Sequence, residues 1–146
     1  MVTTATRYHD ISTGHRVVGH ESKCRHMHGH NYRIHFTCSA PDLDAVGRVI
    51  DFTVINEKLC AWVEKHWDHK FLAWDQDPVM SHSVEHMRHV PMYTDSVVFV
   101  PFNPTAENMA EYLVSVVGPA ELQGTNVVLT SVVIEETAKC RVEHTV

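Results

Sequence analysis

The stretch CRHMHGHNY, residues 24–32, gathers three histidines, a cysteine and a glycine. His28 and His30 are two positions apart, and in a strand this spacing points both side chains to the same face. Two imidazoles on one face can share a metal ion if a third ligand comes from elsewhere, and His15, at the end of the first expected strand, is the best donor. Three histidines with an open fourth position are typical of catalytic zinc. The alternative is two surface histidines that flank a glycine turn.

Other histidines among the 13 in the chain are weaker candidates. His82, His86 and His89 have helical spacing, so a second metal site is one interpretation. A solvated turn in an irregular insertion is the favoured one, since residues 75–95 are polar and irregular. His35 lies an odd number of positions from His30, so we expect it to face away from the metal side of a regular strand.

The elements that must position these residues follow from hydrophobic periodicity. Alternating apolar residues and helical spacing predict strands and helices in the order strand, strand, helix, helix, strand, strand. The expected strands cover residues 3–13, 30–38, 126–134 and 139–145, and the expected helices cover 53–66 and 103–118. Thr105 is a plausible N-cap of the second helix, and Gly118 its end. Strands segregated from helices in this way predict an α+β fold: a four-stranded antiparallel sheet with two helices on one face.

Composition narrows the class of protein. The chain has 146 residues, of which 44% are hydrophobic and 21% charged, a globular balance that suits one domain over residues 1–146. The net charge of −6 and the lack of a Lys/Arg run argue against a nucleic-acid partner. No apolar run reaches the roughly 20 residues of a membrane span, and the N-terminus lacks a signal-peptide pattern. We therefore expect a cytoplasmic protein whose four cysteines are reduced thiols.

Six motifs occur in the order GHRV, CRHMHGHNY, VIDF, WDHKFL, PTAEN and IEET, from about His15 to Cys140. This sequence resembles the 6-pyruvoyl-tetrahydropterin synthase superfamily, and most closely its 6-carboxy-tetrahydropterin synthase branch. The resemblance implies zinc held by His15, His28 and His30. It also implies that Cys24 is a catalytic base and not a ligand.

The same resemblance assigns the remaining site residues. Asp68 and His69 of WDHKFL match the family's acid/base pair, although from the residues alone a surface charge pair at a helix end is favoured. Glu136, which precedes Thr137, matches the glutamate that binds the pterin, and its neighbour Glu135 would face the other way. A carboxylate can accept hydrogen bonds from both the 2-amino group and the ring N–H of a pterin. Thr105 of PTAEN is the second substrate-binding residue expected.

The implied activity is the zinc-dependent conversion of 7,8-dihydroneopterin triphosphate to 6-carboxy-tetrahydropterin, acetaldehyde and triphosphate, as in queuosine and 7-deazaguanine synthesis. The three residues between Cys24 and His28 favour this branch. Two alternatives stay open: triphosphate elimination of the 6-pyruvoyl type, and a non-catalytic zinc- or pterin-binding module. The resemblance also implies the tunnelling fold, in which subunit sheets join into a barrel and two trimers stack into a homohexamer. The apolar strand NVVLTSVVI, which no charge protects, is a physical motive for such assembly.

Overall fold

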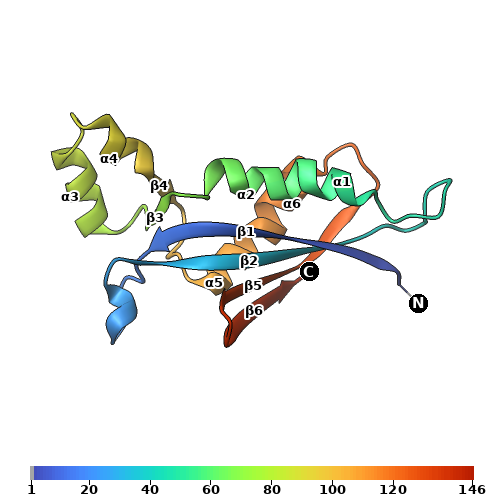
Figure 1. Ribbon diagram of the computed structural model, residues 1–146, viewed down its shortest axis with the longest axis horizontal. Coiled ribbons are helices and arrows are strands. Elements are labelled where there is room, and N and C mark those ends of the chain that lie inside the picture. Colours follow the sequence, from blue (N-terminus) through green and yellow to red (C-terminus); the bar gives the residue numbers. More distant parts are fainter. Residues whose placement is uncertain (1) are drawn as a thin grey trace.

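The computed structural model describes residues 2–146 and contains a curled, mixed six-stranded sheet in the order β4-β3-β1-β2-β5-β6 (Figure 1). The strands are β1 (Thr4–His15), β2 (His28–Ser39), β3 (Phe71–Trp74), β4 (Val97–Val100), β5 (Val128–Thr137) and β6 (Cys140–Thr145). β1, β2, β5 and β6 pair antiparallel, whereas β3 runs parallel to β1 and β4 parallel to β3.

The expected four-stranded antiparallel sheet is therefore wrong in strand number and in pairing. β3 is only four residues long and meets β1 at Gly14 and His15 alone. A strand this short has too few residues to show an alternating pattern. β4 extends the same parallel edge.

The β1–β2 hairpin forms the centre of the sheet. Its register runs from Thr4 opposite Ser39 to His15 opposite His28. Alternate residues of β2, among them Tyr32, Ile34 and Phe36, are fully buried against the helices, as the alternation predicted. The hairpin is closed by residues 16–27, which include the short 3-10 helix η1 (Lys23–Arg25).

Two long helical segments pack on the same face of the sheet and share one hydrophobic core with it. The first consists of α1 (Phe52–Ile55), a π-helical turn η2 (Asn56–Cys60) and α2 (Ala61–His66). The second consists of α5 (Ala106–Tyr112), a π-helical turn η3 (Leu113–Val117) and α6 (Gly118–Glu121).

Gly118 does not end the second segment, contrary to expectation, because its backbone is right-handed helical at φ −55° and ψ −55°. A Cβ at this position would lie 2.9 Å from the Leu129 side chain of β5. The glycine therefore permits close packing of the helix on the sheet.

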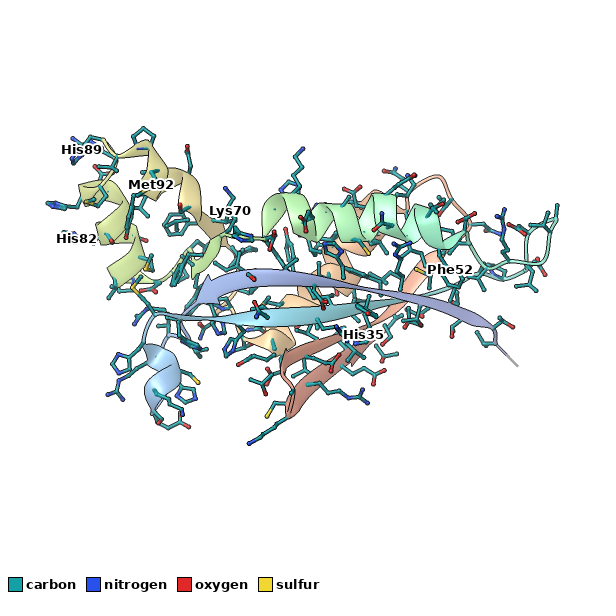
Figure 2. All side chains as sticks on the ribbon, in the orientation of Figure 1. His35, Phe52, Lys70, His82, His89 and Met92 are labelled. Carbon is teal, nitrogen blue, oxygen red and sulfur yellow. The ribbon has the colours of Figure 1, made fainter. Side chains whose placement is uncertain are left out.

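The segment expected to be irregular contains two helices, α3 (Pro78–His86) and α4 (Pro91–Ser96), between β3 and β4. A proline in the first turn begins each of them, since its missing N–H costs nothing there. They project from the end of the sheet beyond β3, and His82, His89 and Met92 lie on this projection (Figure 2). Among the described residues, 2–146, no helix is long and apolar enough to cross a membrane.

The apolar strand NVVLTSVVI is not a sheet edge as expected: β5 lies between β2 and β6. Two edges of the antiparallel part have no neighbouring strand: the outer edge of β6, and the edge of β1 that precedes Gly14, where pairing with β3 begins. These two strands, and not β5, therefore offer unpaired backbone groups with which a strand of another chain could pair.

Candidate metal centre and active site

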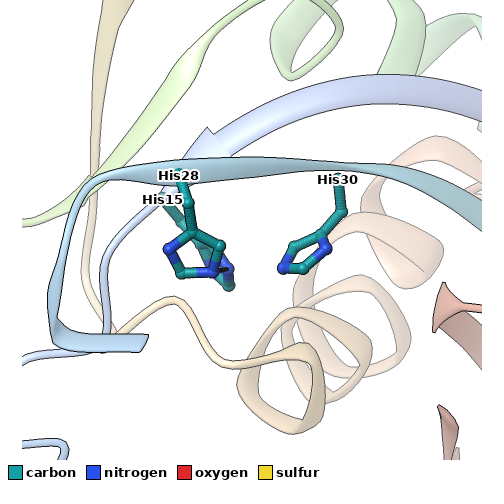
Figure 3. Close-up of side chains that lie close together, drawn as sticks. All are labelled: His15, His28 and His30. Carbon is teal, nitrogen blue, oxygen red and sulfur yellow. Dashed lines mark hydrogen bonds between the residues drawn. The ribbon is translucent and has the colours of Figure 1, made fainter. Parts of the chain in front are cut away.

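Three imidazoles meet at the end of the β1–β2 hairpin, on the helix-covered face. The register sets His15 directly opposite His28, and His30 follows two residues later on the same face. One nitrogen of each imidazole lies within 4.8 Å of the other two (Figure 3). The closest pair is Nε2 of His15 and Nε2 of His28, which are 3.1 Å apart.

For two of the three rings, a backbone carbonyl indicates which nitrogen carries the proton. Nδ1 of His15 lies 2.5 Å from the carbonyl oxygen of Pro104, and Nδ1 of His28 lies 2.7 Å from that of His26. Because a carbonyl oxygen only accepts, both Nδ1 atoms donate, and both Nε2 atoms present lone pairs. A metal-binding histidine typically has this arrangement, with its second nitrogen bonded to a carbonyl.

His30 completes the group. Its Nε2 is buried and makes no hydrogen bond among the described residues, although Oε1 of Glu136 lies 3.1 Å away without hydrogen-bond geometry. Burial lowers the pKa of His15 and of His30, which favours the neutral imidazoles that metal binding requires. Three converging imidazoles, each with a nitrogen within 4.8 Å of the other two, fit a divalent cation such as zinc.

Tyr32 contacts two of the three histidines, and this contribution to the site was missed from the sequence. Its hydroxyl lies 3.2 Å from Nε2 of His15, and its ring stands edge-on to His30. Burial raises the pKa of this phenol above its ordinary value, with smaller contributions from Glu136 and Cys24. The position could have been found from the sequence, because Tyr32 shares the period of His28 and His30.

Glu136 also lies at the cluster, 3.1 Å from His30, and Cys24 lies near Tyr32. Cys24 is half-buried in η1, and its carbonyl accepts a 2.9 Å hydrogen bond from Val17 N–H. Both residues act electrostatically on Tyr32, and Glu136 acts on His15 as well. Glu135, by contrast, bonds His35 at 2.6 Å on the other side of the sheet. The expected opposite orientations of Glu135 and Glu136, and the orientation of His35 away from the cluster, are confirmed.

Asp68 and His69 form a second group. Oδ1 of Asp68 accepts the Ser12 N–H at 2.8 Å, and Oδ2 lies 2.9 Å from Nδ1 of His69. Burial raises the pKa of Asp68, but the bonds to Ser12 and His69 outweigh it, and the net pKa is lowered. His69 has φ 58°, the left-handed region that residues other than glycine rarely adopt, and its side chain is 81% exposed. The carboxylate therefore orients an imidazole that is open to a reaction partner.

The structure does not join this pair to the three histidines. Asp68 and His69 line a cavity of about 720 Å³, together with Ser12, Asn31 and Arg33 from the face opposite the helices and with Glu64 of α2. None of the three clustered histidines lines that cavity. A smaller hollow of about 380 Å³ is lined by both His69 and His30, so the two groups are neighbours. However, the buried His30 Nε2 lies with Tyr32 on the opposite side of the hairpin.

Thr105 occupies the N-cap of α5, where its Oγ1 accepts the Asn108 N–H at 3.1 Å. The capping expectation is confirmed. His82 and His86 stack at a ring-centroid distance of 6.4 Å on exposed α3, apart from the cluster of three.

Comparisons with known proteins identify the family of the chain. A family model described as 6-pyruvoyl tetrahydropterin synthase matches residues 4–145. The chain is similar to the 6-carboxy-5,6,7,8-tetrahydropterin synthases of Rickettsia felis, at 32% identity over 138 residues, and Rickettsia typhi, at 34% over 139 residues. In both cases the match covers 94% of this chain and 96% of the relative.

Solved structures show the same fold. An uncharacterized protein from Wolinella succinogenes superposes with a TM-score of 0.86 at 23% identity, over 99% of this chain and 98% of the other. The 6-pyruvoyl tetrahydropterin synthase of Caenorhabditis elegans superposes with a TM-score of 0.68 at 21% identity, over 100% and 96%. The sheet, its helices and the histidine cluster define an enzyme of the pterin synthase class. The chain belongs to the 6-pyruvoyl tetrahydropterin synthase family.

Proposed function

We propose that the chain is a zinc-dependent 6-carboxy-5,6,7,8-tetrahydropterin synthase. The observation that carries the proposal is the convergence of one nitrogen from each of His15, His28 and His30, with Glu136 beside them and Cys24 nearby. The relatives named above, which match nearly the whole chain, support the carboxy branch over the pyruvoyl branch.

His15, His28 and His30 would hold the zinc ion. When bound, zinc polarises substrate oxygens and makes neighbouring C–H and O–H protons more acidic. The donor set leaves a coordination position open, since the three imidazoles supply one nitrogen each.

The chain's own residues divide the remaining work. Glu136 accepts hydrogen bonds from the 2-amino group and ring N–H of the pterin and so fixes its orientation. Cys24, as the base, removes a proton from a side-chain carbon of 7,8-dihydroneopterin triphosphate. His69, oriented by Asp68, returns a proton elsewhere. One water molecule is consumed to supply the second carboxylate oxygen, the products are 6-carboxy-tetrahydropterin, acetaldehyde and triphosphate, and the ring is reduced at the expense of its own side chain. Thr105 contributes through its cap, which fixes the start of α5 beside the Pro104 carbonyl.

Since the Asp68–His69 pair opens onto the other face of the hairpin, we propose that a second copy of the chain brings its pair to the cluster. The unpaired edges of β1 and β6 suit the strand pairing that would close a barrel. The expected assembly is a homohexamer, a dimer of trimers. Sedimentation at low micromolar concentration should then report about six times 16.6 kDa, and a fully active monomer would contradict the shared site.

One experiment separates the activities. The zinc-loaded protein is incubated with 7,8-dihydroneopterin triphosphate, and the products are identified by mass. Acetaldehyde with 6-carboxy-tetrahydropterin supports the proposal. Triphosphate release without acetaldehyde supports the pyruvoyl-type reaction. Bound but unchanged substrate supports a binding module.

A further inference from the structure

The loop that carries Cys24, residues 16–27, is held by Asn103 from outside it and by the side chain of its own first residue, Arg16. Asn103 pairs with the backbone of Val18 twice: its Oδ1 accepts the Val18 N–H at 3.0 Å, and its Nδ2 donates to the Val18 carbonyl at 2.9 Å. Within the loop, Val17 N–H donates to the Cys24 carbonyl. These bonds fix one strand of the loop against the segment that precedes α5.

Arg16 holds the other side of the loop. Its Nη1 donates to the carbonyl of Arg25, the residue after Cys24, at 2.9 Å. The same guanidinium donates from Nε and Nη2 to the two carboxylate oxygens of Asp77, at 2.6 and 3.2 Å. A planar, bidentate pair of this kind fixes the orientation of the guanidinium as well as its position. Asp77 therefore determines where the third donor of Arg16 points.

Asp77 is a rigid anchor. Its carboxylate is fully buried, and it also accepts the N–H groups of Val79 and Met80 as the N-cap of α3. α3 belongs to the projecting α3–α4 segment, which contributes no residue to the metal cluster or to the Asp68–His69 pair (Figure 2). A helix cap needs only one acceptor oxygen, and an amide would supply it. The negative charge is used by Arg16.

We propose that Asp77 is a positioning residue for the Cys24 thiol, and that the α3–α4 segment serves the reaction by seating the Cys24 loop through the Asp77–Arg16–Arg25 connection. The inference rests on the proposed function for the role of Cys24 as the base. It assigns no contact with substrate to Asp77 itself.

The test replaces Asp77 with asparagine, which keeps the cap acceptor and removes the charge. All variants carry Cys140→Ser, because Cys140 is exposed and Cys38 and Cys60 are buried, so that Cys24 is the thiol that iodoacetamide reaches. The matched control is Glu85→Gln, which removes a carboxylate from the exposed side of the same helix. Three quantities are measured: kcat and KM, zinc content, and the rate of Cys24 alkylation.

We expect Asp77→Asn to lower kcat by roughly 10- to 100-fold, the scale of a misplacement of about 1 Å, while KM and zinc content stay at their wild-type values. Alkylation of Cys24 should become faster, because the loosened loop exposes a half-buried thiol. Glu85→Gln should change none of these quantities. Wild-type kcat and alkylation in Asp77→Asn would overturn the proposal, even if the protein were less heat-stable.

A second variant covers the case in which Asp77→Asn does not fold. Arg16→Met with Asp77→Asn removes both charges and leaves no buried ion unpaired. It should show the same loss of kcat and the same faster alkylation, and wild-type values would overturn the proposal. If the wild-type protein itself converts no substrate, the proposed function fails, and the alkylation rates alone decide whether Asp77 positions Cys24.

Discussion

Two inactive variants should restore activity when they assemble together, because the described chain separates the two groups that the reaction needs. The cluster of His15, His28 and His30, with Cys24 nearby, lies on one side of the hairpin. His69 lines the cavity on the other side. We expect Cys24→Ala alone and His69→Ala alone to be inactive. Each complete site in an assembly would then take its cluster from one chain and its histidine from a neighbour.

The magnitude follows from random assembly. In an equal mixture, a site is complete only when its cluster comes from the His69→Ala chain and its histidine from the Cys24→Ala chain. Each of these two conditions holds for half of the sites, so both hold for one quarter of them. Coexpressed, differently tagged chains should therefore recover about one quarter of the wild-type rate per site. The rate of acetaldehyde formation by doubly tagged, purified assemblies measures this.

The control pairs Cys24→Ala with His28→Ala. Both residues belong to the cluster of one chain, so no mixed site contains both, and no activity should return. If the first mixture also stays inactive, the acid/base pair and the cluster act within one chain, and the argument from the two faces of the hairpin is wrong.

Three further outcomes are expected. The double variant His28→Ala with His30→Ala should lose nearly all of its zinc in a metal analysis, because two of three ligands are gone. Cys24→Ala should keep its zinc and lose turnover by about 100-fold or more. Loss of zinc from Cys24→Ala would show that the thiol is a ligand. Thr105→Ala should lower the free energy of unfolding by about 1 kcal/mol through the lost cap, while Thr105→Ser keeps it, and a KM that rises only in the alanine variant would show a substrate contact. Burial raises the pKa of Asp77, but Arg16 and the helix N–H groups outweigh it, so the folded-state pKa is lowered. Its contribution to stability should be present above about pH 4 and lost as the pH falls through the lowered folded pKa, and urea titrations should show a weaker acid dependence in Asp77→Asn.

The sequence predicted the parts of the fold that rest on long periodic patterns. β2 and the helix around Leu59 and Val63 have such patterns, and both were expected close to their observed bounds. β3 was missed because four residues cannot show alternation. α3 and α4 were missed because their faces are polar and project from the core, so Asp77 and the two prolines were the available signals.

The candidate site was predictable to a different degree. The two-residue spacing of His28 and His30 fixed their common face, and antiparallel pairing of the first two strands brought His15 opposite. The separation of His69 from that cluster was not predictable. It depends on the left-handed backbone conformation of His69 and on the hydrogen bond from the Ser12 N–H to Asp68. No local pattern encodes contacts over such sequence separations.

The hydrogen bond between His15 and the Pro104 carbonyl joins residues 89 positions apart. All three candidate zinc ligands, however, lie within the first 30 residues, on a hairpin whose pairing is local. During synthesis the N-terminal part of a chain emerges first, at about 5–20 residues per second, and hairpins form in microseconds. The ligand set is therefore complete several seconds before the carbonyl that fixes the tautomer of His15 exists. If the nascent hairpin binds a metal ion, either ring nitrogen of His15 could be the ligand. Once Pro104 has been synthesised and its carbonyl accepts from Nδ1, Nε2 remains as the ligand atom.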